Sequence, residues 1–98
     1  MLLFGAMRDK EHARMLALLG PHVDAVVFAR AHTPRAEAAH TLREAYGGEA
    51  FDTVQRALSR ARKLAGKRGL VVACGSIFLM AEVRAITLGI AADPVIAL

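Results

Sequence analysis

The chain has 98 residues, of which 55% are hydrophobic and 22% are charged, and its formal net charge is +4. This length suits one domain with a modest core, and the apolar content excludes a disordered chain. The charge is compatible with an anionic ligand, although an arginine-rich, high-GC genome is the simpler explanation of it.

Cysteine content and hydropathy indicate the cellular compartment of the protein. The single cysteine, Cys74, cannot form an internal disulfide, which favours a reducing compartment. Met1–Met7 is too short for a secretory signal. The uncharged apolar run Leu70–Ala81 is too short for a membrane span of ~20 residues. We therefore expect a cytoplasmic protein with no membrane association.

Strands and helices alternate along the first two thirds of the chain, and glycine, proline and capping residues separate them. We expect a strand at Leu2–Phe4, a helix from a capping Asp9 to about Leu19 that stops at Gly20-Pro21, and a strand at Asp24–Ala29. A helix follows over about Ala36–Tyr46, with four residues pointing inward: Ala39, Leu42, Ala45 and Tyr46. After a short strand at Glu49–Phe51, a further helix starts at Asp52, which forms a capping box with Gln55, and ends at Gly66.

The last third contains the stretch around which the chain is organised. Leu70–Cys74 is short and β-branched, as expected of a strand buried on both faces. Gly75 permits a tight turn, and Ser76 can cap a helix over Ile77–Leu88. That helix is apolar nearly all round, so we expect much of it to be covered. After Gly89, Asp93-Pro94 turns into Val95–Leu98, a candidate final edge strand.

This alternation predicts an α/β fold, a Rossmann-like three-layer domain over residues 1–98. Its mainly parallel sheet has four or five strands, with helices on both faces joined by right-handed crossovers. Ligands of such folds bind at the carboxyl ends of the strands, so the loops there are the first places to look for a site.

Three of these loops carry residues suited to binding. Asp9-Lys10-Glu11 lies at a strand-to-helix junction, where helix capping and dipole compensation explain the charges without a ligand. The Arg30–Arg35 loop contains His32 and Arg35 and could clamp a carboxylate or phosphate, or be a solvated loop. Gly75-Ser76 could offer backbone N–H groups to an anion. These loops give the substrate-binding candidates Asp9, Lys10, His32, Arg35, Gly75 and Ser76.

Other patterns favour ordinary structural roles. Cys74 is expected to be a core thiol, and the four histidines have no metal-ligand spacing, so no metal site and no catalytic residue is predicted. The sequence has no dinucleotide or P-loop glycine motif. A basic stripe runs along Arg56–Lys67; a solvated face explains it better than nucleic-acid binding, because the aromatic residues that stack on single strands are missing.

Four motifs in order carry a resemblance to a known family, and the resemblance runs from Leu2 to about Leu88. They are LLFGAMRDKE, TPRA, FDTVQRAL and VVACGSIFLMAEVR. The pattern resembles the C-terminal domain of bacterial folylpolyglutamate synthase/dihydrofolate synthase, in the Mur ligase superfamily. By this resemblance, Asp9, Lys10 and Glu11 match the family's Asp-Lys-Asp with Glu in the last place. Pro34-Arg35 matches its Pro-Arg loop and Gly75-Ser76 its Gly-Ser turn.

The resemblance implies a function for the whole enzyme. Family members use ATP to form an acyl phosphate on a folate or pteroate carboxyl group, which the glutamate amine then attacks. The active site lies between a large ATP-binding domain and this smaller domain. The matching residues would face the interdomain cleft, with Arg35 as the best candidate for the glutamate carboxylate or another anionic group.

The departures from the family pattern limit what this chain can do alone. The family's ATP loop, its metal-binding residues, its folate-binding segments and the first strand and helix of its small domain have no counterpart here. We therefore expect a fragment that is inactive alone, binds no cofactor itself, and depends on an N-terminal domain that supplies ATP and Mg. An apolar strip should be exposed, and a homodimer is a further possibility.

Two alternatives remain open at this stage. The chain could be a stand-alone α/β module that binds a small anion or another protein. Nucleic-acid binding through the basic stripe is the less favoured of the two.

Overall fold

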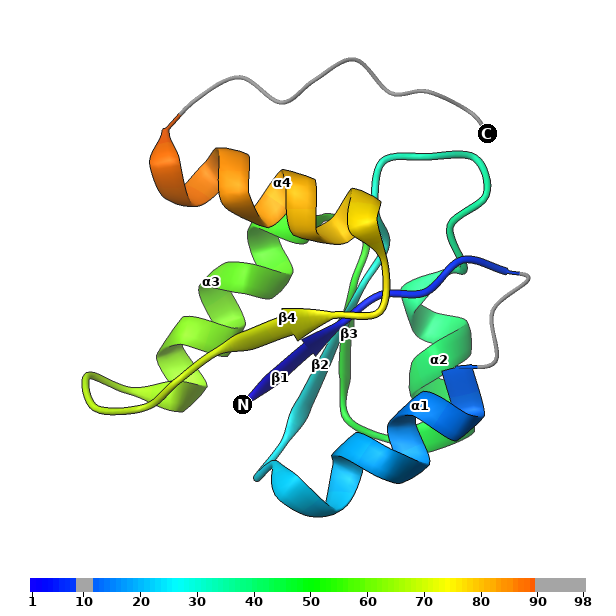
Figure 1. Ribbon diagram of the computed structural model, residues 1–98, viewed down its shortest axis with the longest axis horizontal. Coiled ribbons are helices and arrows are strands. Elements are labelled where there is room, and N and C mark those ends of the chain that lie inside the picture. The colour runs from blue at the N-terminus through cyan, green and yellow to red at the C-terminus, as the bar shows by residue number, and fades with distance from the viewer. Residues whose placement is uncertain (9–11, 90–98) are drawn as a thin grey trace.

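Four short parallel strands form the centre of the fold (Figure 1). The computed structural model describes residues 1–8 and 12–89. Its elements are β1 (Leu2–Phe4), α1 (His12–Leu19), the short 3₁₀ helix η1 (Gly20–His22), β2 (Val26–Ala29), α2 (Ala39–Tyr46), β3 (Glu49–Phe51), α3 (Val54–Ala65), β4 (Val72–Cys74) and α4 (Ile77–Leu88).

The sheet has the strand order β3-β2-β1-β4, and all neighbouring strands are parallel. Phe4 in β1 lies beside Phe28 in β2 and Cys74 in β4. The chain moves outward from β1 through β2 to β3, and then crosses back to the opposite edge at β4. The predicted α/β class, with a parallel sheet and helices on both faces, is therefore confirmed for the described residues.

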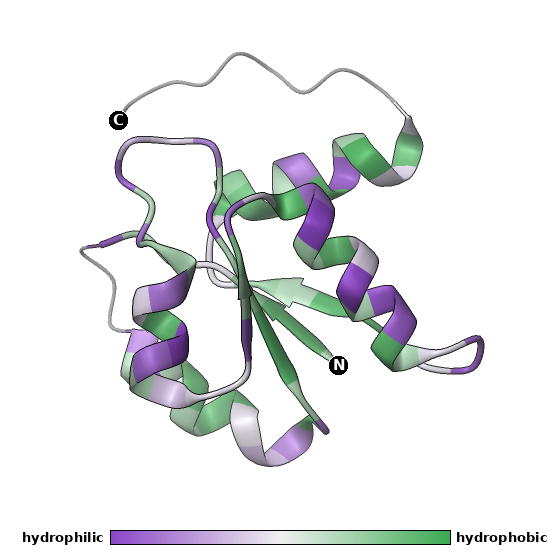
Figure 2. Cartoon of the chain, turned by 180° about the vertical axis from the view of Figure 1, so that it is seen from behind, coloured by the Kyte–Doolittle hydropathy of each residue, from purple (hydrophilic) through white to green (hydrophobic). Residues whose placement is uncertain are grey.

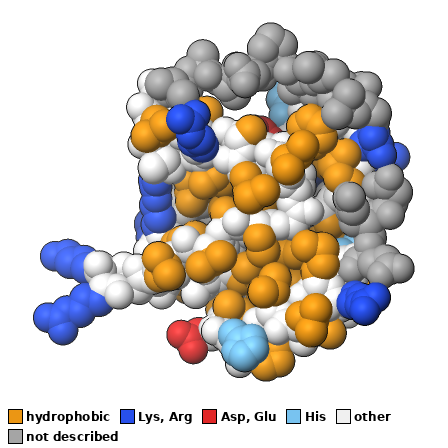
Figure 3. All heavy atoms as spheres, in the orientation of Figure 1, with side chains coloured by type: hydrophobic (Ala, Val, Ile, Leu, Met, Phe, Trp, Pro, Cys, Tyr) orange, Lys and Arg blue, Asp and Glu red, His pale blue; other side chains and the backbone are white. Residues whose placement is uncertain are grey.

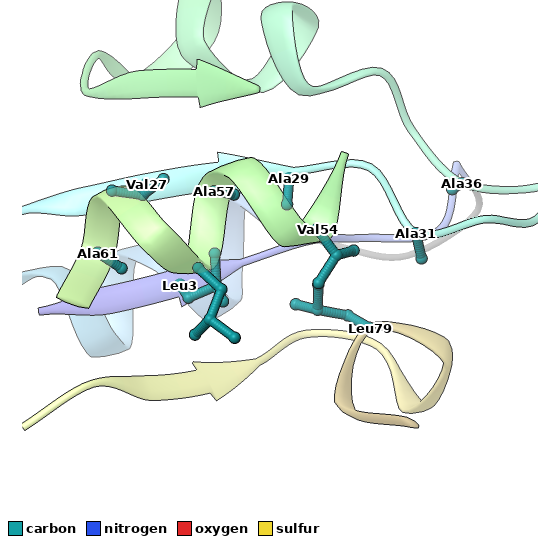
Figure 4. Close-up of a cluster of buried hydrophobic side chains, with 10 residues drawn as sticks. Leu3, Val27, Ala29, Ala31, Ala36, Val54, Ala57, Ala61 and Leu79 are labelled. Atoms are coloured by element: carbon teal, nitrogen blue, oxygen red, sulfur yellow. The ribbon is translucent and has the colours of Figure 1, made fainter. Parts of the chain in front are cut away.

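Alternate side chains of the strands enter two separate cores. Leu3 and Val27 point to one face, where they pack with Ala57 and Leu58 of α3 and Leu79 of α4 (Figure 4). On the opposite face, Leu2 and Phe4 of β1 and Phe28 of β2 form a second cluster. They pack with Leu16 of α1 and with Ala39 and Leu42 of α2. These clusters make the three layers that Figure 1 shows, with α3 and α4 on one side of the sheet and α1 and α2 on the other.

Helix α3 is the most clearly amphipathic element, and its apolar residues at i, i+3, i+4 and i+7 are the ones that are buried: Val54, Ala57, Leu58 and Ala61. Its outer side is hydrophilic (Figure 2). Thr53 caps it, since the Thr53 hydroxyl accepts a hydrogen bond from Arg56 N–H at 3.3 Å. The prediction that Asp52 provides this cap is therefore wrong by one residue.

Helix α2 begins at Ala39, three residues later than predicted, because Ala36 is held in an antiparallel bridge to Met7. Of its four residues expected to point inward, Ala39 and Leu42 are buried, whereas Ala45 is exposed and the Tyr46 side chain is 39% exposed. The Tyr46 hydroxyl lies 2.7 Å from His12 Nδ1, so this ring joins α2 to α1 instead of entering the core.

The stretch Leu70–Arg84 forms the predicted strand, turn and helix, but the strand begins at Val72 and not at Leu70, and its environment differs from the prediction. Strand β4 is an edge strand and not a strand buried on both faces, because only β1 pairs with it among the described strands. Val72 is 45% exposed and Leu70 is 73% exposed. In α4 only Leu79 and Ala85 are buried, so the expected cover over this helix is wrong for the described part of the chain. The expected apolar strip is visible over this region in Figure 3.

Two predictions lie outside the described residues. They are the start of the first helix at Asp9, and the turn at Asp93-Pro94 with a strand at Val95–Leu98. Within the described ranges, no helix has the length and apolar content that a membrane crossing requires.

Candidate ligand site at the carboxyl edge of the sheet

An open groove of about 760 Å³ lies at the carboxyl edge of the sheet. Three segments form its walls: the loop after β2, the start of α3, and the middle of α4. The residues that line it are Arg30, Ala31, His32, Thr33, Pro34, Asp52, Thr53, Val54, Gln55, Glu82 and Ile86. The parallel topology explains this convergence, because the strands that lead into the loop after β2, α3 and α4 all end at the same edge.

Glu82 ties two walls of the groove together. Its Oε2 atom accepts a hydrogen bond of 2.7 Å from the backbone N–H of His32, although the residues are 50 positions apart in sequence. This bond fixes the loop after β2 against α4. Sequence reasoning missed Glu82; its signal was an isolated carboxylate in an otherwise apolar helix that has one other charged residue, Arg84.

Thr33 is the buried polar residue of the groove. It is 3% exposed, and its hydroxyl Oγ1 has no hydrogen-bond partner among the described residues. Its backbone is held by N–H donation to Ala31 O at 2.8 Å and by acceptance from Ala36 N–H at 3.1 Å. A buried hydroxyl without a partner costs about 1–3 kcal/mol, so Thr33 is a site of unfavourable energy in the wall of the groove.

The groove carries charges of both signs. Arg30 and His32 are exposed at its loop wall, and the first turn of α3 adds the positive end of a helix dipole. Asp52 and Glu82 contribute carboxylates. Among the described residues no three His, Cys, Asp or Glu side chains gather as metal ligands. This donor set therefore fits a small molecule that itself carries both an anionic and a cationic group.

Arg35, the favoured residue of the predicted anion clamp, follows the groove-lining part of its loop. Its carbonyl oxygen accepts a hydrogen bond of 2.9 Å from Arg8 N–H. Glu37 N–H donates to Ala6 O at 2.8 Å, and Met7 is bridged to Ala36. The loops after β1 and β2 are thus joined through their backbones. Asp9 and Lys10, and Glu11 after them, lie outside the described residues.

Gly75 and Ser76 have structural roles that the structure makes explicit. A Cβ atom on Gly75, whose φ is 104°, would lie 2.2 Å from Gly5 O and 2.9 Å from a ring carbon of Phe4. The Ser76 hydroxyl accepts hydrogen bonds from Phe78 N–H at 3.1 Å and Leu79 N–H at 3.4 Å. Neither residue lines the groove. Of the six candidate residues, the structure therefore places His32 in the groove and Arg35 beside it in the loop.

Cys74 and the arginines of the basic stripe have contacts that are explained without a ligand. Cys74 is half-buried, and burial raises the pKa of its thiol, so it stays protonated at neutral pH. Arg60 pairs with Glu49 at 2.9 Å, Arg56 lies 5.7 Å from the ring centroid of Phe51, and Arg62 donates to the Thr87 hydroxyl at 3.2 Å. These contacts fit a solvated helix face with local partners.

Two comparisons with known proteins found relatives of this chain. The family model for the Mur ligase, glutamate ligase domain, matches residues 1–77. A Haloferax volcanii protein named as a probable bifunctional folylpolyglutamate synthase/dihydropteroate synthase is 37% identical over 89 residues, which cover 85% of this chain and 10% of that protein. The chain thus spans about a tenth of this relative's length. No solved structure matches the chain significantly. The chain belongs to the Mur ligase family, as a glutamate ligase domain.

Proposed function

We propose that this chain is the substrate-side domain of an ATP-dependent ligase that joins L-glutamate to a folate or pteroate carboxyl group. In this proposal it lines the cleft between itself and an ATP-binding domain in the cytoplasm. The observation that carries the proposal is the groove of mixed charge at the carboxyl edge of the sheet, in a chain of the glutamate ligase domain family.

The groove offers suitable partners for each polar group of glutamate. The Arg30 guanidinium, the His32 ring and the first turn of α3 favour carboxylates. The Glu82 and Asp52 carboxylates favour an ammonium group. Holding both ends of the amino acid would orient its amine toward an activated acyl group in the cleft, and such positioning is the main contribution that a domain of this kind can make.

The proposal assigns neither ATP nor Mg to this chain. The sequence has no phosphate-binding glycine motif, and the described side chains form no cluster of metal ligands. In the proposal, ATP and Mg are held by another part of the ligase, and Arg35, Gly75 and Ser76 belong to the surface that faces the cleft.

Binding of L-glutamate to the isolated chain tests the role of the groove. We expect amide chemical-shift changes for residues that line it, His32, Thr33 and Val54 among them, when ¹⁵N-labelled chain is titrated with L-glutamate. Arg30→Ala should weaken this binding at least about tenfold, since a charged hydrogen bond contributes about 1.5–3 kcal/mol. Arg43→Ala, which removes an exposed arginine of α2, is the matched control and should leave the binding unchanged.

An activity assay tests the claim that the chain is inactive alone. Incubation with ATP, Mg²⁺, dihydropteroate and labelled glutamate should yield no conjugate. Conjugate formed by the purified chain would contradict the proposal that another part of the ligase holds ATP and Mg. Shift changes that are absent, or that follow the basic residues of α3 instead of the groove, would contradict the proposed glutamate site.

A further inference from the structure

The positive charge of the chain is concentrated in one segment. Thr53–Ala81 contains no Asp or Glu and six of the 13 Lys and Arg residues: Arg56, Arg60, Arg62, Lys63, Lys67 and Arg68. The rest of the chain holds the other seven Lys and Arg residues and all nine Asp and Glu residues, so its formal charge is −2 against +6 for this segment. Codon bias acts along the whole chain and does not explain this separation, which points to an anionic partner.

Part of this segment lines a second depression, on the outer side of α3, with a volume of about 420 Å³. We call it the α3 depression. It is lined by Phe51 of β3 and by five residues of α3: Gln55, Arg56, Ser59, Arg60 and Lys63. The last four recur at i, i+3, i+4 and i+7, so they share one helix face, which Figure 2 shows as hydrophilic. All of these polar side chains can donate hydrogen bonds, and no carboxylate is among the described residues that line the depression.

Two of the three cations in the α3 depression are held in place by the protein itself. The Arg56 guanidinium carbon lies 5.7 Å from the ring centroid of Phe51. The Arg60 Nε donates to both carboxylate oxygens of Glu49, at 2.9 and 3.2 Å. Because Glu49 is bound through Nε, the terminal amino groups of this guanidinium can donate to a further acceptor. Side chains that are held before a ligand arrives lose less conformational entropy when it binds.

These local contacts leave most of the charge of the α3 depression uncompensated. Among the described residues, Glu49 is the carboxylate that pairs with its cations, and it offsets one of the three positive charges, so a formal charge of +2 remains. A phosphomonoester matches this charge, because it carries about −1.5 to −2 at neutral pH and has three strong acceptor oxygens. A single carboxylate or a phosphodiester carries one negative charge and would leave the site positive.

We propose that the α3 depression is a second ligand site, which binds the phosphate group of a small phosphomonoester. Arg56, Arg60 and Lys63 donate charge-assisted hydrogen bonds to the phosphate oxygens, which is the recognition that guanidinium and ammonium groups provide at phosphate sites. Gln55 lines both the groove and the α3 depression, so the two sites adjoin on α3 without sharing a charged residue. The proposal does not depend on the assignment of glutamate to the groove.

A titration of the ¹⁵N-labelled chain with ribose 5-phosphate, at constant ionic strength, tests the site. We expect saturable amide chemical-shift changes at residues that line the α3 depression, Arg56, Ser59 and Lys63 among them. Ribose lacks the phosphate group and should cause none of these changes. A short DNA duplex presents phosphodiesters of single charge, and at the same phosphate concentration it should bind more weakly than ribose 5-phosphate.

Charge-removing variants test which cations hold the phosphate. Lys63→Gln should raise the dissociation constant of ribose 5-phosphate about threefold, as expected for the loss of one exposed charge pair. The double variant Arg56→Gln/Lys63→Gln should raise it about tenfold. Lys67→Gln is the matched control, because it removes the same charge from the same segment at a residue that does not line the α3 depression. It should leave the dissociation constant within about twofold of wild type.

Three results would overturn the proposal. An absence of shift changes with ribose 5-phosphate would mean that the face is only solvated. Equal weakening by Lys63→Gln and Lys67→Gln would mean diffuse attraction to a positive surface and no defined site. Tighter binding of the duplex, with shift changes that extend to Lys67 and Arg68, would assign the face to nucleic acid. The double variant should still show the groove shifts with L-glutamate, so this proposal and the proposed glutamate site can fail separately.

Discussion

The Glu82 carboxylate and the His32 backbone N–H, 50 residues apart in sequence, are joined by a hydrogen bond of 2.7 Å that fixes one wall of the groove to another. The loop after β2 therefore depends on α4 for its position. The sequence of the loop alone therefore does not show which of its residues line the groove, because α4 holds the loop in place.

Removing this hydrogen bond should loosen the groove. We expect Glu82→Ala to lower the free energy of unfolding by about 1 kcal/mol, less than a buried charged hydrogen bond contributes, because this bond is exposed to solvent. Glu82→Gln keeps an acceptor oxygen and should cost less. Urea denaturation measures both, and the exchange rate of the His32 amide should rise in the alanine variant only. Glu44→Ala, an exposed glutamate of α2, should change stability by less than about 0.5 kcal/mol. Equal effects of the Ala and Gln substitutions would argue against the bond.

The turn at Gly75 should not tolerate a side chain. Gly75→Ala introduces a Cβ into a backbone with φ of 104° and within 2.2 Å of Gly5 O. Backbone strain and the clash together should destabilise the fold by at least about 2 kcal/mol. Gly20→Ala is a suitable control, because a Cβ there meets no atom within 4 Å. Thermal unfolding followed by circular dichroism would separate the two variants, and equal melting temperatures would contradict the close approach of β4 and β1.

Ser76 should act as a helix cap whether or not it also contacts a ligand. Its hydroxyl accepts from Phe78 and Leu79 N–H, so Ser76→Ala should cost about 1 kcal/mol of stability. Ser59→Ala, at an exposed interior position of α3, should be neutral or slightly stabilising. Chemical denaturation of both variants gives the comparison. A Ser76→Ala variant as stable as wild type would refute the capping role.

Stability should fall at alkaline pH in a way that depends on Cys74. Burial raises the thiol pKa, so the folded state holds this proton more tightly than the unfolded state does. The stabilisation is fully present below the thiol pKa of the unfolded chain and is lost as pH rises through the higher pKa of the folded chain. Relative to Cys74→Ala, wild type should lose stability between neutral pH and about pH 10. Urea titrations at both pH values measure this, and a wild-type advantage that grows with pH would contradict the assigned environment.

The sequence was sufficient for the elements whose signals are local. Leu2–Phe4, Glu49–Phe51 and Ile77–Leu88 are predicted with the bounds that the structure shows, because strand composition and the Gly75-Ser76 turn act over a few residues. The start of α2 was not predictable in this way. Ala36 has no local reason to leave a helix, and a bridge to the distant Met7 holds it outside one.

The burial of each residue and the composition of the candidate site depend on which helices and strands pack together. Local sequence patterns do not show this packing. The apolar character of α4 predicts a covered helix, yet it leaves Ile77 and Leu88 exposed. His32 was recognised from its loop, and Thr33 lies in the same loop, whereas Glu82 joins the site only through the tertiary arrangement. Residue type alone could not have separated Glu82 from any other carboxylate on a helix.

The bridge between Met7 and Ala36 has a thermodynamic consequence for recognition at this edge. With the hydrogen bonds from Arg8 to Arg35 and from Glu37 to Ala6, it orders residues 6–8 and 35–37 during folding. A ligand then does not have to freeze these backbone segments from a mobile state. Less of its interaction energy is consumed as lost conformational entropy, and more remains as affinity.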